Sequence, residues 1–189
     1  EAASLLEEKT EGWVTGIRLA ALSMHHREDA QEVLRRLAAE HRYIWDYLIS
    51  EVLSAMKPEI QNFLIKTAIL DRFCASLCDA VRRDSNAESM TLPETHAAGS
   101  QEILETLQQE NLFIIPLDGQ RHWFRYHHLF QQLLAAELKK QFNADQIAVF
   151  HLKASSWYGQ AGLVDEALQH ALDAGDDLAA AQLVEENAR

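Results

Sequence analysis

The feature that most constrains the fold is a single β-hairpin pattern in a chain whose other apolar periodicity is helical. Two apolar or aromatic runs, residues 112–117 and 120–126, are joined by Asp118-Gly119. This dipeptide favours a two-residue type I′ turn, because both central residues need a positive φ. Pro116 cannot donate to a strand ladder, so its strand is expected at a sheet edge. One hairpin with few glycines and prolines predicts a mainly α-helical protein.

Helical periodicity precedes the hairpin. Apolar side chains recur at helical spacing over residues 44–56 and 60–68, and a shorter helix is expected over residues 73–81. Ser100 can cap a further helix over residues 100–110, because its hydroxyl can accept the amide protons of the first turn. Helices followed by a half-buried hairpin form the element order of a winged-helix domain.

The chain divides into three predicted regions. The sequence pattern predicts helices over residues 1–40. It predicts the winged-helix domain over residues 41–142, with a polar insertion before the last helix of that domain. Residues 143–189 predict short Ala-rich helices that stop at Gly162 and Gly175, the start of a TPR-like α-solenoid. The chain starts without Met and within a helical pattern, and it has no signal peptide. We therefore expect a piece of a longer cytoplasmic protein.

The charge distribution disfavours direct DNA binding. The sequence has 17 basic and 29 acidic residues, a net charge of −12, whereas phosphate binding needs clustered cations. The helix that would read DNA contains Glu102, Glu105 and Glu110 and no Lys or Arg. The hairpin adds only Arg121 and Arg125. We expect this winged helix to serve in packing and regulation.

No catalytic or metal-binding residue is expected. None of the seven glycines is followed by Lys-Ser or Lys-Thr, so a P-loop is excluded, and no G-x-S-x-G motif occurs. No two of the nine histidines lie three or four residues apart, so a helical metal pair is excluded as well, whereas a zinc site assembled in space from distant residues stays open. Cys74 and Cys78 are interpreted as small buried thiols in a reducing compartment. No apolar run approaches the roughly 20 residues that span a bilayer.

The segment in which the hairpin passes into the next helix is the best candidate binding site. His127 lies at this junction, Arg125 lies on the strand before it, and the emerging helix offers unpaired amides. A guanidinium, an imidazole and a helix N-terminus together can bind an anion. The competing interpretation is that His127 or His128 caps the helix or packs in the core.

These residues carry a family resemblance. Arg-Tyr-His-His-Leu-Phe at residues 125–130, followed by Leu-Leu-Ala-Ala-Glu-Leu, resembles the winged helix of the MalT-like regulators, which are LuxR-type, ATP-dependent bacterial transcription activators of the STAND class. Further similar segments follow in the same order over nearly the whole chain: residues 10–23, 68–79, 104–113 and 161–171.

The resemblance implies a role for each region. Residues 1–40 would end the helical lid of a STAND NTPase module, and residues 143–189 would begin a superhelical sensor. The full-length protein would bind ATP or ADP through an N-terminal domain and DNA through a C-terminal one. This piece would couple nucleotide state and inducer sensing to self-association. By itself it would not be an enzyme and would not bind nucleotide tightly. It would not contact a membrane.

The resemblance also implies candidate nucleotide-binding residues. STAND winged helices carry a Met-His-Asp-like motif whose His contacts the β-phosphate of ADP and holds the resting state closed. Tyr126-His127-His128 occupies this place, so only His127 carries over, with Arg125 beside it.

A second STAND element, G-x-P, has its Pro near the adenine. It could align with Gly16-Ile17-Arg18, where Arg replaces Pro, and a buried helix is the competing interpretation. Gly16 and Arg18 are therefore further cofactor-binding candidates.

Two other functions stay open at this point. One is a stand-alone helical adaptor that binds protein partners through its acidic face. The other is a winged helix that itself binds DNA. A reading frame ending near Arg189 without an upstream P-loop would favour the adaptor, and salt-dependent duplex binding would favour the DNA-binding domain.

Overall fold

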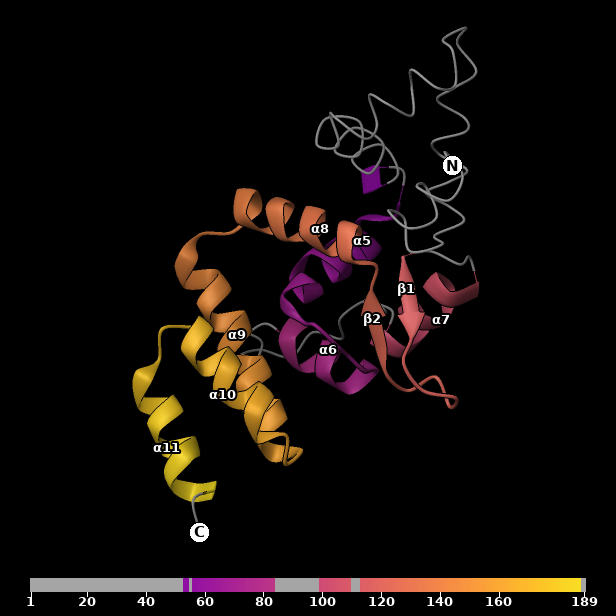
Figure 1. Cartoon of the computed structure of the whole chain (residues 1–189). Helices are drawn as coiled ribbons and strands as arrows, with labels where there is room; N and C mark the ends of the chain where they lie inside the picture. Colours follow the sequence, from indigo (N-terminus) through magenta and orange to yellow (C-terminus); the bar gives the residue numbers. More distant parts are fainter. Residues whose placement is uncertain (1–52, 55, 84–98, 110–112, 188–189) are drawn as a thin grey trace, which may run out of the picture.

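The computed structural model (Figure 1) describes residues 53–54, 56–83, 99–109 and 113–187. The predictions for residues 1–40, including those for Gly16 and Arg18, lie outside the described residues. The elements are α5 (Pro58–Lys66), the 3₁₀ helix η1 (Thr67–Ile69), α6 (Ala75–Arg82), α7 (Ser100–Gln109), β1 (Ile114–Pro116), β2 (Phe124–Tyr126), α8 (His128–Gln141), α9 (Ala144–Gln160), α10 (Val164–Asp173) and α11 (Asp177–Asn187).

The first half of the described chain is a winged helix, and the rest is a row of helices, as predicted (Figure 1). β1 and β2 pair antiparallel, with Ile114 opposite Tyr126. Among the described strands β1 has only β2 as a neighbour, so the edge position predicted from Pro116 is confirmed. The division of the chain near residues 40 and 142 stays a prediction.

A third, one-residue strand completes the small sheet. Phe73 bridges Phe124, and each backbone N–H donates to the other residue's carbonyl over 2.8 Å. The helix predicted to start at Phe73 therefore starts only at Ala75, because the backbone of Phe73 is engaged in the sheet. β2 is thus hydrogen-bonded on both edges.

The predicted two-residue hairpin turn is wrong. The narrowest pair is Leu117 and Trp123, with the Leu117 amide donating to the Trp123 carbonyl over 2.8 Å. The loop therefore has five residues, 118–122, and its hydrogen bond from the Arg121 amide to the Asp118 carbonyl closes a turn, as is usual for loops of this length. Arg121, not Gly119, has the positive φ, 57°. The Asp118 carboxylate accepts the amide protons of residues 122 and 123, at 2.9 and 3.0 Å, and thereby fixes the longer loop.

The winged-helix core is built from large side chains. Its fully buried aromatic residues are Phe63, Phe73, Phe113, Tyr126 and Phe130. The Phe113 and Phe130 rings stack with centroids 3.9 Å apart, and the Phe73 and Tyr126 centroids lie 4.5 Å apart. The sheet is therefore held against α8 by aromatic packing.

Ser100 does not act as the predicted cap of α7. It is the first residue of the helix and is buried, and its hydroxyl accepts a hydrogen bond from Arg82 over 3.1 Å. The Asp79 carboxylate, on α6, accepts from the Ser100 amide over 3.1 Å instead. A side chain of a neighbouring helix thus satisfies the start of α7.

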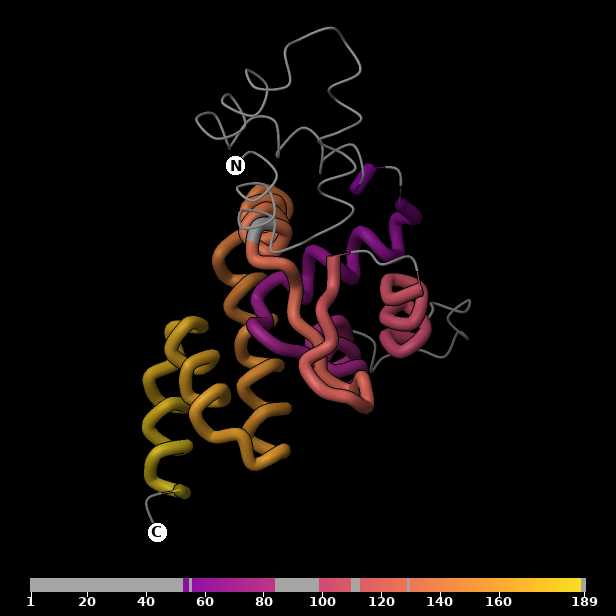
Figure 2. The backbone as a smooth tube through the Cα atoms, turned by 45° about the vertical axis from the view of Figure 1, so that its right-hand side comes forward, coloured from indigo at the N-terminus to yellow at the C-terminus, as the bar shows by residue number. Residues whose placement is uncertain are grey.

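The helices after α8 run back and forth beside each other (Figure 2). Asn143 begins α9 with a reciprocal capping box to Gln146. Gly162 and Gly175, with φ of 75° and 73°, follow the ends of α9 and α10, so both predicted stops are confirmed. Among the described residues, no helix has both the length and the apolarity that a bilayer crossing requires.

Candidate functional site

The junction between β2 and α8 positions the residues predicted to bind a phosphate. Along β2 the side chains of Phe124 and Tyr126 are buried, whereas Arg125 is half-exposed. His127 follows at the N-cap of α8 and is also half-exposed, with its Nδ1 atom buried. Arg125 and His127 are therefore two partly exposed residues that flank the buried Tyr126.

Backbone contacts hold this junction in place. The His127 amide donates to the Phe113 carbonyl over 3.0 Å, and its carbonyl accepts the Gln131 amide over 2.9 Å. Arg125 donates from Nη1 to the Tyr126 carbonyl over 3.2 Å. The imidazole does not cap α8 by a side-chain hydrogen bond, which removes one of the competing interpretations of His127.

Tyr126 anchors the junction from inside. Its hydroxyl lies 2.7 Å from the Thr67 hydroxyl, which donates to the Phe63 carbonyl over 2.6 Å. Burial raises the pKa of the Tyr126 phenol well above its ordinary value. A neutral tyrosine therefore fills the first position of the motif as a core residue, and His128, at the third position, is exposed.

A joint between the winged helix and the following helices is the second feature of the site. Arg72 forms an ion pair with Glu166 on α10, and its carbonyl accepts the Tyr158 hydroxyl over 2.7 Å. The Arg72 guanidinium lies 4.9 Å from the ring centroid of Trp123. Trp123 in turn meets Trp157 of α9 edge-on, with ring centroids 6.1 Å apart. We call these five residues the joint.

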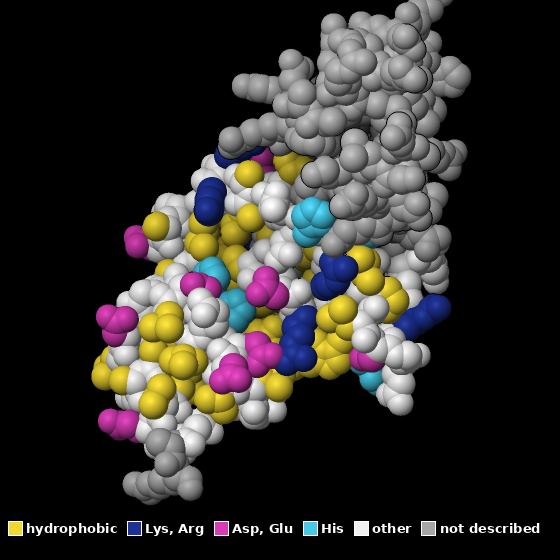
Figure 3. Space-filling model, in the orientation of Figure 1, with side chains coloured by type: hydrophobic (Ala, Val, Ile, Leu, Met, Phe, Trp, Pro, Cys, Tyr) yellow, Lys and Arg dark blue, Asp and Glu magenta, His cyan; other side chains and the backbone are white. Residues whose placement is uncertain are grey.

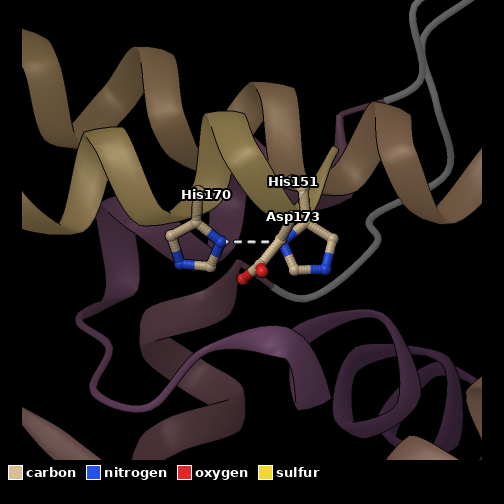
Figure 4. A group of neighbouring side chains, drawn as sticks. All are labelled: His151, His170 and Asp173. Atoms are coloured by element: carbon tan, nitrogen blue, oxygen red, sulfur yellow. Dashed lines mark hydrogen bonds and ion pairs between the residues drawn. The ribbon is translucent and has the colours of Figure 1, made fainter. Parts of the chain in front are cut away.

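A cluster of three ionisable side chains lies between α9 and α10 (Figure 4). His151 on α9 and His170 on α10 face each other with their Nδ1 atoms 2.9 Å apart. An Asp173 carboxylate oxygen lies 3.9 Å from Nδ1 of His151. We call these residues the His-His-Asp cluster.

Sequence reasoning missed this cluster. The two histidines are 19 residues apart and meet only because α9 packs on α10. The available signal was His170 and Asp173, which lie one helical turn apart on the same face of α10.

The environment of the cluster keeps its imidazoles neutral. Burial and, to a smaller extent, the neighbouring His151 lower the pKa of His170 to about 4, although nearby carboxylates oppose the shift. Burial also lowers the pKa of His151. Both rings therefore carry lone pairs at neutral pH.

The would-be recognition helix presents no cation. The solvent-exposed residues of α7 are Gln101, Glu102, Glu105 and Gln109. Its apolar side faces the core through Ile103, Leu104 and Leu107. The described exposed face is acidic and amide-bearing, which is unfavourable toward phosphates.

Comparisons with known proteins identify relatives of two kinds. The family model "MalT winged helix domain" matches residues 49–146. The serine/threonine-protein kinase PknK of Mycobacterium tuberculosis (strain ATCC 25618 / H37Rv) is 32% identical over 96% of this chain and 15% of its own length. The HTH-type transcriptional regulator MalT of Vibrio campbellii is 30% identical over 93% of the chain and 18% of its own length.

A further regulator of the same printed name, from Klebsiella pneumoniae (strain 342), is 31% identical over 92% of the chain and 18% of its own length. The chain thus spans less than a fifth of the length of these relatives. The similarity extends beyond residues 49–146 on both sides.

Proposed function

This chain belongs to the MalT winged helix domain family, and from that premise we propose that it is the coupling segment of a larger ATP-dependent transcription regulator. The segment would act without catalysis of its own. Nucleotide binding would belong to an N-terminal domain and DNA binding to a C-terminal domain of the same protein. An inducer would act on the helices that begin with α9.

The observation that carries this proposal is the position of β2. Trp123, just before the strand, contacts Trp157 of α9, and His127, just after it, begins α8. β2 is hydrogen-bonded on both edges, to β1 and to Phe73. β2 thus connects the contact with α9 to the start of α8, and we expect it to transmit a displacement of α9 to His127.

A switch also needs contacts that differ between its two states. With ADP bound, His127 and Arg125 would contact its phosphates and hold the winged helix against the nucleotide-binding domain. ATP together with inducer would break this contact and release surfaces for self-association. The partial exposure of both His127 and Arg125 supports this assignment.

The test uses the full-length protein. His127→Ala should lower the amount of ADP that copurifies and raise basal transcription. His122→Ala, on the exposed tip of the hairpin, is the matched control and should leave both values at wild type. Wild-type ADP content together with wild-type basal transcription in His127→Ala would overturn the latch.

A second variant tests the coupling separately from the latch. Trp157→Ala removes the ring that meets Trp123 at the joint and touches neither His127 nor Arg125 in the described contacts. ADP content should stay at the wild-type level, while the inducer response should fall. An unchanged inducer response would show that coupling does not pass through this contact.

The match with PknK favours a second candidate, a regulatory segment of a protein kinase. The kinase is 32% identical over 96% of this chain, so the same module could report to a catalytic domain instead of a DNA-binding one. The flanking reading frame separates the two. A kinase domain in the same frame would favour this candidate, whereas a nucleotide-binding domain and a C-terminal helix-turn-helix without a kinase domain would favour the regulator.

A further inference from the structure

The His-His-Asp cluster has the composition and the spacing of a cation site. Each of its three residues offers one ligand atom, and these atoms all lie within 4.8 Å of one another. His170 and Asp173 come from one turn of α10, and His151 reaches them from α9 (Figure 4). Two packed helices therefore hold all three ligands, which is firmer support than a loop would give.

The distance between the two imidazoles suits a shared metal ion. With His–metal bonds of 2.0–2.1 Å, two nitrogens on one tetrahedral ion lie about 3.3 Å apart. The two Nδ1 atoms are 2.9 Å apart, so a small opening of the pair admits the ion. Without metal, one Nδ1 must carry the hydrogen that the other accepts. With metal, that proton would reside on Nε2 and both Nδ1 lone pairs would point at the ion.

The surroundings favour a cation that enters from solvent. His170 is 7% exposed and stacks on Tyr158, with ring planes 11° apart. The carboxylates of Asp71 and Glu166 act electrostatically on His170 in addition to that of Asp173. The Asp173 side chain is 44% exposed, so the open side of the cluster is the carboxylate side. A water molecule could complete the coordination there.

We propose that His151, His170 and Asp173 bind a divalent transition metal ion of the Zn²⁺ class. Imidazole ligands select Zn²⁺, Ni²⁺, Co²⁺ or Cu²⁺ over Ca²⁺ and Mg²⁺, which prefer oxygen. The site adjoins the joint, because Tyr158 both stacks on His170 and donates to the Arg72 carbonyl. Metal occupancy would therefore stiffen the contact between α10 and the winged helix.

The experiment uses the tag-free 189-residue chain with Co²⁺ as a spectroscopic probe. Titration should produce the visible absorption of tetrahedral Co²⁺ at one equivalent, and Zn²⁺ should displace it. His151→Gln and Asp173→Asn should each weaken binding by about tenfold or more, since loss of supporting groups alone costs 10–100-fold. His122→Gln, an exposed histidine of the hairpin loop, should bind as the wild type does.

Asp173→Asn keeps the proposal falsifiable if a buried histidine variant fails to fold, because Asp173 is largely exposed. Nitrogen NMR of the imidazole rings gives an independent readout: Zn²⁺ should convert the ring that carries its proton on Nδ1 to the Nε2–H form. Two results would overturn the proposal. One is the absence of stoichiometric Co²⁺ binding, and the other is equal affinity in wild type, His151→Gln and Asp173→Asn.

Discussion

The winged helix and the helices α9–α11 bury different kinds of side chain. The core of the winged helix contains large aromatic rings, such as those of Phe73 and Phe113, which are fully buried. Between α9 and α10 the buried residues include Ala154, Ala167 and Ala171. Large rings hold a small sheet against its helices, whereas alanines let two helix backbones approach closely. The core of the first region continues into α9, whose Phe150 and Tyr158 are buried in the same cluster, and the second region is a stack in which each helix relies on its neighbours.

α10 and α11 expose large apolar side chains, with Leu172 at 49%, Leu178 at 70% and Val184 at 51%. Figure 3 shows hydrophobic side chains gathered on this part of the molecule, with acidic groups between them. Substitutions that test packing should therefore cost much in the winged helix and little on α11.

The largest effect is expected at Phe73. Its ring is fully buried against Tyr126 and Phe124, so Phe73→Ala should lower the free energy of unfolding by about 3–5 kcal/mol through lost burial and a cavity. Urea denaturation measures the loss. A decrease as small as that of an exposed substitution would contradict the aromatic core described for the winged helix.

A smaller loss is expected between α9 and α10. Ala167 is fully buried, and its carbonyl accepts the Ser155 hydroxyl over 2.8 Å. Ala167→Val adds methyl groups where the helices touch and should cost about 1–3 kcal/mol. Ala181→Val, on the exposed side of α11, is the matched control for helix propensity. Equal costs at the two positions would show that α9 and α10 are not closely packed.

At the joint, Tyr158→Phe should lower the free energy of unfolding by about 0.5–1.5 kcal/mol, because the Arg72 carbonyl loses its donor. Burial raises the pKa of the Tyr158 phenol, so the folded protein favours the neutral form. The unfolded chain ionises near its ordinary pKa of about 10, and the stabilisation is therefore lost as the pH rises above that value. Urea unfolding from neutral to alkaline pH should show a smaller alkaline loss in the variant than in wild type.

The smallest effect is expected on α11. Leu178 is 70% exposed, so Leu178→Ala should change the free energy of unfolding of this chain by no more than about 0.5 kcal/mol. The same urea titration measures it. A loss comparable to that of Ala167→Val would mean that another surface covers this side of α11.

Local chemistry explains why much of the fold could be predicted from the sequence. Pro116 lacks an amide proton and therefore marks the edge strand, and the glycines at 162 and 175 can adopt the positive φ that ends α9 and α10. The sequence also predicts His127 at the strand-to-helix junction, because the aromatic strand pattern ends there and helical periodicity begins. The nucleotide-contact roles of His127, Arg125, Gly16 and Arg18 stay predictions.

The errors arose where a distant residue or a side chain decides the structure. A one-residue strand such as Phe73 has no periodicity to read, and Asp79 starts α7 across a 21-residue separation. The hairpin has a longer loop than expected, because the Asp118 carboxylate accepts the amide protons of residues 122 and 123. The His-His-Asp cluster needed two helices to meet before its members became neighbours.

The turns after α9 and α10 have the same hydrogen bonds. Leu163 donates to the Tyr158 carbonyl over 2.9 Å, and Asp176 donates to the Ala171 carbonyl over 3.0 Å. The number of residues between the two turns therefore fixes which side of α10 faces α9. One residue inserted within α10 would rotate everything after it by about 100° and turn the alanine side of α10 away from α9. An insertion within α10 is therefore expected to disrupt the packing of α10 on α9 more than an insertion in either turn.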